Sequence, residues 1–491
     1  MKNIKYIAIM ALGLVACEPE LDNSIEDAGF YSAGTANFSN FVSVGNSLTA
    51  GYADGTVYLE GQKYSYPNIL ADKFSHVGGG IFTQPLVNDN LGGLTLGGSI
   101  IADTRLVLTG DPLGPDNLAG MPTTEVSNIL TGPFNNVGVP GAKSFHLLSD
   151  SYGNISGVSG GTANPYFVRM ASSPSATMLG DAVAQNPTFF SLWIGNNDIL
   201  SFATSGGVGV DQMGNLDPTT YGGNDITDPM VFHGTYDALL SGLTANGAKG
   251  VVMNLPSVTS IPYFTTVPYN AIPMDAATAG ATNANPLVAG YNGGLLAAMG
   301  AMAIDAAEVA QRTINFTAGQ NALVIEDESL TDLSGFGLPS IRQATSADLI
   351  TLPTSSIIGT LADPSNPASV IGVAVPLNDS QVLTENEVSM VAAAQAAYNN
   401  SISMLAAANN NVVLVDVKTA MERLASGGLS SNGVTITDDY ATGGGFSLDG
   451  VHPTARGYAF IANIILDKIN SEFNATIPVT NTGNYPTAYI D

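Results

Sequence analysis

The sequence predicts an α/β protein whose parallel sheet is covered by helices. Short β-type runs alternate along the chain with helix-type runs, which is the order expected when a crossover helix follows each strand. Hydrophobic residues make up 45% and charged residues 11% of the 491 residues. Such a composition can bury a large core and excludes global disorder, and one elaborated α/β domain could use the whole length.

Five apolar segments are the candidate strands. The run at residues 188–194 suits the centre of the sheet, because a parallel strand buried on both faces is apolar throughout. The other four candidates are residues 41–44, 137–139, 250–255 and 412–417. Helical patterns lie between and after them, at residues 66–74, 176–184, 230–245 and 454–474.

The alternation weakens between residues 256 and 383. Pro, Gly, Ser, Thr and Asn dominate there, with one Ala-rich helical stretch near residues 295–311. We interpret about 256–383 as a large insertion in a single α/β domain that spans residues 38–480. Thr384 and Glu387 then form a capping-box pattern that predicts the start of a long Ala-rich helix.

The first residues have the pattern of an export signal. Lys2 and Lys5 precede an apolar stretch that is too short to span a bilayer, and Cys17 follows directly. This arrangement resembles a bacterial lipobox, which implies a signal peptide at residues 1–16, a lipidated Cys17 and stable membrane anchoring. An ordinary secretory signal with an incidental cysteine is the alternative. Residues 17–37 are polar and Gly-rich, as expected for a flexible tether.

The location that follows from this signal is the cell envelope, as an outer-membrane lipoprotein. The acidic residues after Cys17 resemble the export signal of some Gram-negative surface lipoproteins. Cys17 is the only cysteine, so internal disulfides and Cys-based zinc sites are excluded. The net charge of -27 would repel a phosphate backbone, which argues against nucleic acid as a partner.

The first candidate for chemistry is Ser47, which lies in the sequence Gly-Asn-Ser-Leu directly after the first predicted strand. A serine at a tight strand-to-helix turn can project its hydroxyl from the carboxyl end of a parallel sheet, where α/β sites usually form. The same tetrapeptide is also ordinary turn chemistry. Alone, it does not separate a nucleophile from a turn residue.

The second candidate is the pair Asp449 and His452, three residues apart in a turn before the last predicted helix. A serine hydroxyl is a weak nucleophile until a base takes its proton, and that base is usually an imidazole oriented by a carboxylate. The alternative is a structural turn in which Asp449 caps the helix. His76, His146 and His233 show no metal-ligand spacing, so we expect no metal site.

Two further blocks lie at predicted strand ends. Asn197 belongs to the sequence Gly-Asn-Asn-Asp after the central strand, and its side-chain amide could stabilise a negatively charged oxygen. Gly141 follows the second strand and could present a backbone N–H close to a ligand. Both blocks also fit simple turns.

Along the chain these four motifs are Gly-Asn-Ser-Leu at 45–48, Gly141, Gly-Asn-Asn-Asp at 195–198 and Asp-Gly-Val-His at 449–452. Taken together and in that chain order, they resemble the SGNH hydrolases, also called the GDSL lipase/esterase family. The resemblance implies a three-layer α/β/α sandwich, SGNH or flavodoxin-like, with a parallel sheet of about five strands. It implies Ser47 as nucleophile, His452 as general base and then acid, and Asp449 as orienting carboxylate. The implied oxyanion hole combines the Ser47 and Gly141 backbone N–H groups with the Asn197 side chain, and no cofactor is implied.

One residue departs from the family pattern, and the assignment of one glycine stays open. The family's aspartate before the serine is Asn46 here, which can make the same side-chain-to-backbone turn bond. Gly138 lies three residues before Gly141 and is an alternative source of the oxyanion N–H.

The leading functional hypothesis is a serine esterase or lipase-like acyl hydrolase that cleaves carboxylic esters of lipids or acylated glycans. A carbohydrate O-acetyl esterase is the nearest alternative. A non-catalytic lipoprotein that binds glycan or lipid on the same fold is a third. The mean hydropathy of +0.20 leans weakly toward a lipid or acyl substrate.

Overall fold

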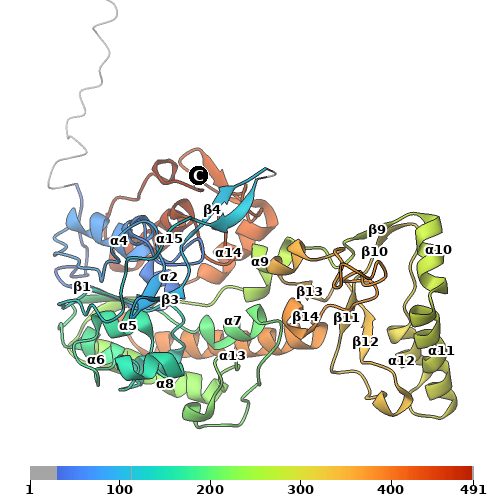
Figure 1. Ribbon diagram of the computed structural model, residues 1–491. Coiled ribbons are helices and arrows are strands. Elements are labelled where there is room, and N and C mark those ends of the chain that lie inside the picture. The colour runs from blue at the N-terminus through green and yellow to red at the C-terminus, as the bar shows by residue number, and fades with distance from the viewer. Residues whose placement is uncertain (1–29, 112, 489–491) are drawn as a thin grey trace, which may run out of the picture.

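The computed structural model describes residues 30–111 and 113–488. Its centre is a five-stranded parallel sheet with the strand order β15-β8-β7-β1-β6 (Figure 1). The chain is thus an α/β protein, as predicted. The predicted signal peptide, Cys17 and most of the expected tether lie outside the described residues. The strands of this sheet are β1 (Phe41–Gly45), β6 (Asn136–Gly138), β7 (Phe189–Trp193), β8 (Lys249–Met253) and β15 (Val412–Val415).

All five predicted strands are confirmed, with ends that move by one or two residues. The apolar run at 188–194 becomes β7, the middle strand, and every residue of β7 is buried. The strand expected at 412–417 ends earlier, because Asp416 caps the next helix and accepts a hydrogen bond from the Thr419 N–H. A helix start therefore replaces the last two strand positions.

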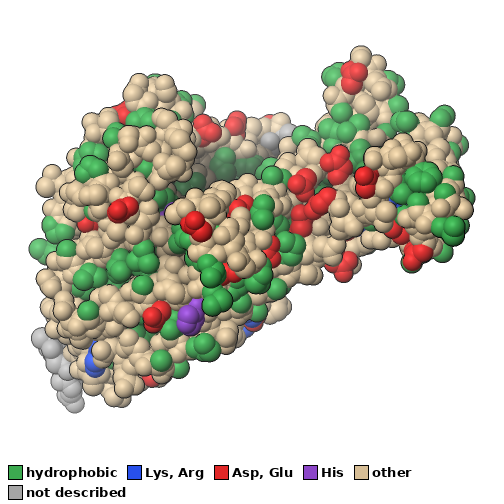
Figure 2. Space-filling model, turned by 90° about the horizontal axis from the view of Figure 1, so that it is seen from below, with side chains coloured by type: hydrophobic (Ala, Val, Ile, Leu, Met, Phe, Trp, Pro, Cys, Tyr) green, Lys and Arg blue, Asp and Glu red, His purple; other side chains and the backbone are tan. Residues whose placement is uncertain are grey.

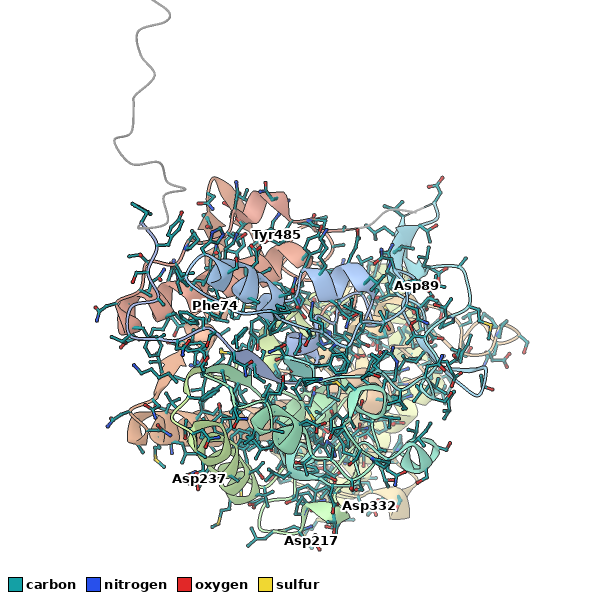
Figure 3. All side chains as sticks on the ribbon, turned by 90° about the vertical axis from the view of Figure 1, so that its left-hand side faces the viewer. Phe74, Asp89, Asp217, Asp237, Asp332 and Tyr485 are labelled. Atoms are coloured by element: carbon teal, nitrogen blue, oxygen red, sulfur yellow. The ribbon has the colours of Figure 1, made fainter. Side chains whose placement is uncertain are left out.

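Two groups of helices pack around this sheet. Helix α4 (Tyr66–Ser75) contacts α15 (Ala455–Phe473), and α15 also contacts β15. Helix α8 (Pro229–Thr244) contacts both α6 (Met178–Val183) and α13 (Glu385–Ala408). These five helices confirm the helices predicted at residues 66–74, 176–184, 230–245 and 454–474 and the long helix predicted after Thr384. In Figure 3, Phe74 of α4 lies inside the molecule, where its ring stacks on Phe38 at 4.1 Å between centroids.

Shorter elements complete the sheet domain. Three of them follow strands of the sheet directly: α2 (Ser47–Ala50), α7 (Asn197–Thr204) and α14 (Val417–Gly427). The rest are α3 (Leu59–Lys63), α5 (Pro165–Met170), α9 (Pro262–Thr265), and the two-stranded pairs β2 (Leu94–Leu96) with β3 (Ser99–Ala102), β4 (Leu106–Thr109) with β5 (Gly114–Asn117), and β16 (Leu429–Ser431) with β17 (Val434–Ile436).

Residues 267–382, in the chain between β8 and α13, form a second lobe beside the sheet domain (Figure 1). This lobe has its own hydrophobic cluster, which extends from Val267 to Val382. Its elements are α10 (Ala276–Ala284), α11 (Pro286–Gly300), α12 (Ala306–Arg312), and the pairs β9 (Ile272–Met274) with β10 (Gly319–Asn321), β11 (Val324–Glu326) with β12 (Ile341–Gln343), and β13 (Leu349–Ile350) with β14 (Val382–Leu383).

The single helix predicted near residues 295–311 is wrong. Helix α11 ends at Gly300 and α12 begins at Ala306. Between them Met302 has φ 61°, and Asp305 caps α12 by accepting a hydrogen bond from the Glu308 N–H. An Ala-rich composition favours helix across the whole stretch, but this left-handed residue and the N-cap divide it.

The molecular surface carries the acidic balance of the sequence. On the face seen in Figure 2, acidic side chains are spread over both lobes and few Lys or Arg side chains are visible. Within the described residues, no helix is both long enough and apolar enough to cross a bilayer.

Candidate active site

The candidate site lies at the carboxyl end of the parallel sheet. Ser47 begins α2 directly after β1, and Asn197 begins α7 shortly after β7. Gly45, the last residue of β1, must be small there, because a Cβ would lie 2.4 Å from the Trp193 carbonyl oxygen. Asn46 caps α2 by accepting a hydrogen bond from the Leu48 N–H at 3.1 Å, which confirms the turn bond predicted for this position.

The structure brings Ser47, His452 and Asp449 together. The Ser47 Oγ lies 2.8 Å from the His452 Nε2, and the His452 Nδ1 lies 2.8 Å from the Asp449 Oδ2. Ser47 is only 6% exposed, and the His452 and Asp449 side chains are 13% exposed. A hydroxyl, an imidazole and a carboxylate are therefore in one hydrogen-bonded line in a largely water-excluded place, which is the arrangement that activates a serine.

The turn that holds Asp449 and His452 is tightly built. Asp449 Oδ1 accepts hydrogen bonds from the Val451 N–H at 2.9 Å and the His452 N–H at 2.8 Å. Gly450 has φ 71° and lies against Tyr263, so the turn needs a glycine at this position. Backbone donors thus orient the carboxylate toward the imidazole.

The electrostatic environment keeps Asp449 ionised. Burial raises the pKa of Asp449. The neighbouring His452 and the N–H groups of His452 and Val451 lower this pKa by more than burial raises it, so that the net value is about 2. The carboxylate is therefore charged at any pH at which the protein would be assayed. An ionised Asp449 favours an imidazole that carries a proton on Nδ1 and can accept one on Nε2.

Further contacts support Asp449, one from its own loop and one from the segment after β1. The Ser447 hydroxyl donates to Asp449 Oδ1 at 3.1 Å, and the Gly55 N–H donates to Asp449 Oδ2 at 3.1 Å. Asp54, which is 4% exposed, binds the same loop: its N–H donates to Ser447 Oγ, and its Oδ1 accepts from the Leu448 N–H. Sequence reasoning missed Asp54 and Ser447, because nearly 400 residues separate them and neither lies in a recognisable motif.

The residues predicted for the oxyanion hole lie at neighbouring strand ends. The Asn197 side chain donates to the Ala142 carbonyl at 2.9 Å, which ties the end of β7 to the loop after β6. Of the two alternative glycines, Gly138 already donates its N–H to Asn136 Oδ1 at 2.9 Å. Gly141 lies on the exposed part of that loop with φ 79°.

His146, Phe264 and Tyr263 have structural contacts. Burial, followed by the charge of Lys143, lowers the pKa of His146 to about 3, and its Nδ1 accepts a hydrogen bond from the Lys143 N–H. Phe264 is buried in the core, and the Tyr263 hydroxyl donates to the Thr204 carbonyl.

Comparison with known proteins relates part of the chain to a protein family. No curated protein and no solved structure matches the chain. A family model described as GDSL-like Lipase/Acylhydrolase matches residues 337–465, which is less than half of the chain but includes Asp449 and His452. This match confirms that the sequence resembles the GDSL-like lipase/acylhydrolase family in the segment 337–465.

Proposed function

We propose that the protein is a serine esterase that cleaves carboxylic esters through an acyl-enzyme intermediate. The observation that carries this proposal is the continuous line Ser47 Oγ, His452 Nε2, His452 Nδ1 and Asp449 Oδ2, with both gaps at 2.8 Å. The GDSL-like family match supports ester hydrolysis as the general class of reaction. In this proposal Ser47 is the nucleophile, His452 the base and Asp449 the group that orients it.

In the first half-reaction, the Ser47 Oγ forms a bond to the ester carbonyl carbon while its proton moves to His452 Nε2. The carbonyl π electrons move to oxygen, which becomes an oxyanion on a tetrahedral carbon. When this intermediate collapses, the bond to the alkoxy oxygen breaks and His452 returns its proton to the departing alcohol. The acyl group remains on Ser47.

In the second half-reaction, a water molecule replaces the alcohol. His452 takes one water proton while the water oxygen attacks the acyl carbon. Collapse of the second tetrahedral intermediate breaks the bond to Ser47 Oγ, which regains its proton from His452. The products are a carboxylic acid and the free enzyme.

For the oxyanion, we propose the Ser47 N–H, the Gly141 N–H and the Asn197 side chain. A side-chain amide has two N–H donors, and the Ala142 carbonyl takes one of those of Asn197. We favour Gly141 over Gly138, because the Gly138 N–H already serves Asn136. Removal of one donor of this kind typically lowers kcat about 10²–10³-fold.

Replacement of the proposed nucleophile tests the mechanism. We expect Ser47→Ala to lower the hydrolysis of p-nitrophenyl butyrate to the level of the uncatalysed reaction, because no acyl-enzyme can form. A fluorophosphonate should label the wild-type protein at Ser47, as located by peptide mass spectrometry. The matched control is Ser403→Ala on the exposed face of α13, which should keep both activity and labelling. A folded Ser47→Ala variant with wild-type activity would refute the proposal.

We also propose that the core is a three-layer α/β/α sandwich. The segment at about residues 256–383 is then an insertion in this domain. The separate hydrophobic cluster of the second lobe supports the insertion. Helices α4 and α15 contact each other, whereas α8 contacts α6 and α13, which supports two helical layers.

The proposed location is the outer membrane, by way of a lipid on Cys17. The support is the run of basic, apolar and small residues that ends at this single cysteine. Lipid attachment supplies hydrophobic anchoring that the folded domain does not need to provide. We expect the full-length protein to fractionate with membranes and Cys17→Ser to appear in the soluble fraction. Equal membrane recovery of both proteins would refute lipid anchoring at this residue.

A further inference from the structure

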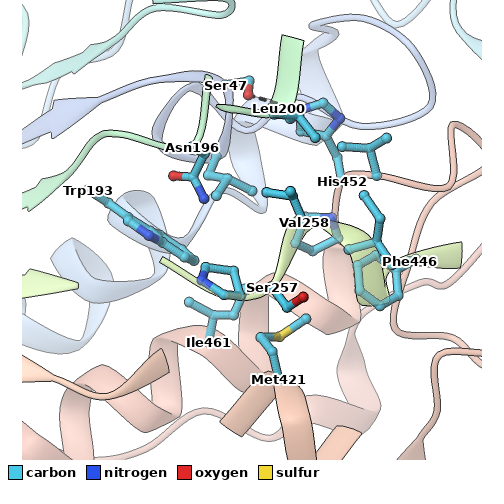
Figure 4. Close-up of a pocket in the computed structure, with 15 residues that line it drawn as sticks. Ser47, Trp193, Asn196, Leu200, Ser257, Val258, Met421, Phe446, His452 and Ile461 are labelled. Atoms are coloured by element: carbon cyan, nitrogen blue, oxygen red, sulfur yellow. Dashed lines mark hydrogen bonds between the residues drawn. The ribbon is translucent and has the colours of Figure 1, made fainter. Parts of the chain in front are cut away.

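An apolar cavity opens beside the Ser47 hydroxyl. In Figure 4, Ser47 and His452 lie at one end of this cavity, and Met421 and Ile461 lie at the opposite end. Its volume is about 50 Å³. The walls come from elements far apart in the sequence, including α7 with Leu200, the segment after β8 with Val258, and the loop before Asp449 with Phe446.

The lining of this cavity disfavours the binding of charged groups. Aliphatic, aromatic and thioether side chains make up most of the wall, and the polar exceptions besides the candidate active-site residues are Asn196 and Ser257. Among the described residues, no Asp, Glu, Lys or Arg side chain lines the cavity. A charged group or a sugar ring placed there would lose its hydration without compensation, whereas an alkyl chain would gain by leaving water.

A second, smaller cavity lies behind the inner end of the first. Its volume is about 10 Å³, and Met421, Pro453 and Ile461 line both cavities. The remaining wall of the second cavity is almost entirely aliphatic or aromatic, with Leu424 and Phe460 among its residues. Of the three shared residues, Met421 alone is an unbranched, flexible side chain, so it can be shortened or widened without changing the backbone.

We propose that this cavity holds the acyl chain of the ester and that Met421 sets the longest chain it accepts. This inference rests on the proposed esterase function and names its substrate class: uncharged acyl groups of about four to six carbons. The cavity volume of about 50 Å³ counts only the space open to the centre of a water-sized sphere. By this measure one water-sized group takes roughly 10–15 Å³, so the cavity holds three to five such groups beyond the carbonyl. An acetyl group would leave most of the cavity empty.

The chain-length profile of the wild-type enzyme gives the first arm of the test. Each methylene that enters the cavity should raise kcat/KM about fourfold, the factor expected from burying one CH₂. For p-nitrophenyl esters from acetate to dodecanoate, we expect kcat/KM to rise to a maximum at butyrate or hexanoate and to fall from octanoate onward. A profile that is highest at acetate, or flat, would overturn the acyl pocket.

Two substitutions of Met421 give the second arm. Met421→Ala removes the partition between the cavities, so we expect the maximum to move to longer chains by about two to four carbons. The ratio of decanoate to butyrate activity should then rise at least about tenfold. Met421→Phe should move the maximum in the opposite direction. Met404→Ala, an exposed methionine on α13, is the matched control and should keep the wild-type profile.

The outcomes separate the two proposals. If wild type hydrolyses these esters through Ser47 but neither Met421 variant shifts the profile, the pocket assignment is overturned and the esterase assignment stands. If no ester is hydrolysed and fluorophosphonates do not label Ser47, both assignments are overturned. Should Met421→Ala fail to fold, Met421→Phe and the relative rates of Ser47 labelling by ethyl and octyl fluorophosphonate decide the question.

Discussion

At the scale of single residues, two buried carboxylates in contact with the same loop have opposite electrostatic behaviour. The pKa of Asp449 falls to about 2, because His452 and several N–H groups more than offset burial. Burial raises the pKa of Asp54 to about 6, with the Asp449 charge adding to it, although the Leu448 N–H and the Tyr58 hydroxyl lower it in part. The site thus keeps one carboxylate ionised beside the imidazole and makes ionisation of the other costly.

This difference predicts the pH dependence of stability at Asp54. Its pKa is higher in the folded than in the unfolded state, so its ionisation lowers stability as pH rises from about 4 to 6, and the loss is complete above pH 6. We expect Asp54→Asn to gain about 2–3 kcal/mol of stability relative to wild type between pH 4 and pH 7. Urea unfolding of both proteins at these two pH values measures the difference.

Asparagine is the appropriate replacement, because Asp54 has φ 52° and asparagine tolerates this left-handed conformation. Asp237→Asn, which makes the same change of side chain at an exposed position of α8, is the control. A stability difference between Asp54→Asn and wild type that is the same at pH 4 and pH 7 would contradict the prediction.

At the scale of elements, local signals account for where helices begin. The capping box predicted at Thr384 is present, since Glu387 Oε2 accepts both the Thr384 N–H at 2.7 Å and its hydroxyl at 2.8 Å. The same kind of signal explains the missed break between α11 and α12, where Asp305 is the N-cap. Composition alone is a weaker guide to helix boundaries than a polar side chain that satisfies the first free N–H groups.

At the scale of the whole molecule, the two largest hydrophobic clusters belong to the sheet domain and to the second lobe (Figure 1). The second lobe also contains a buried ionic group of its own. Arg342, which is 4% exposed, contacts Asp327 at 2.6 Å and Asp348 at 2.6 Å. These contacts link β12 to the loops on either side of it within the lobe.

Loss of Arg342 should therefore destabilise the second lobe selectively. Arg342→Ala leaves two buried carboxylates unpaired, which typically costs about 3–5 kcal/mol. We expect hydrogen exchange to accelerate mainly at residues 267–382, while β1, β7 and Ser47 labelling by fluorophosphonate stay as in wild type. Arg423→Ala on the exposed face of α14 is the control. Equal loss of protection in both lobes would show instead that the two clusters unfold as one unit.

Much of the secondary structure and the position of each chemical block could be predicted from the sequence. Strand β7 is marked by a continuous apolar run, and the Asn46 turn, the Thr384 cap and the block around Asp449 are patterns of a few neighbouring residues. Such patterns work because periodicity and turn chemistry depend on local backbone geometry. By itself, the sequence determined the α/β class and where along the chain chemistry-bearing side chains follow strands.

Tertiary structure alone decided which distant residues meet. Ser47 and His452 are separated by 405 positions and approach to 2.8 Å, because the segment after β1 packs against the loop before α15. The support of Asp449 by Asp54 and Ser447, and the position of Met421 between two cavities, likewise depend on packing between remote segments. No local pattern encodes such contacts, since burial of the whole hydrophobic surface selects them together.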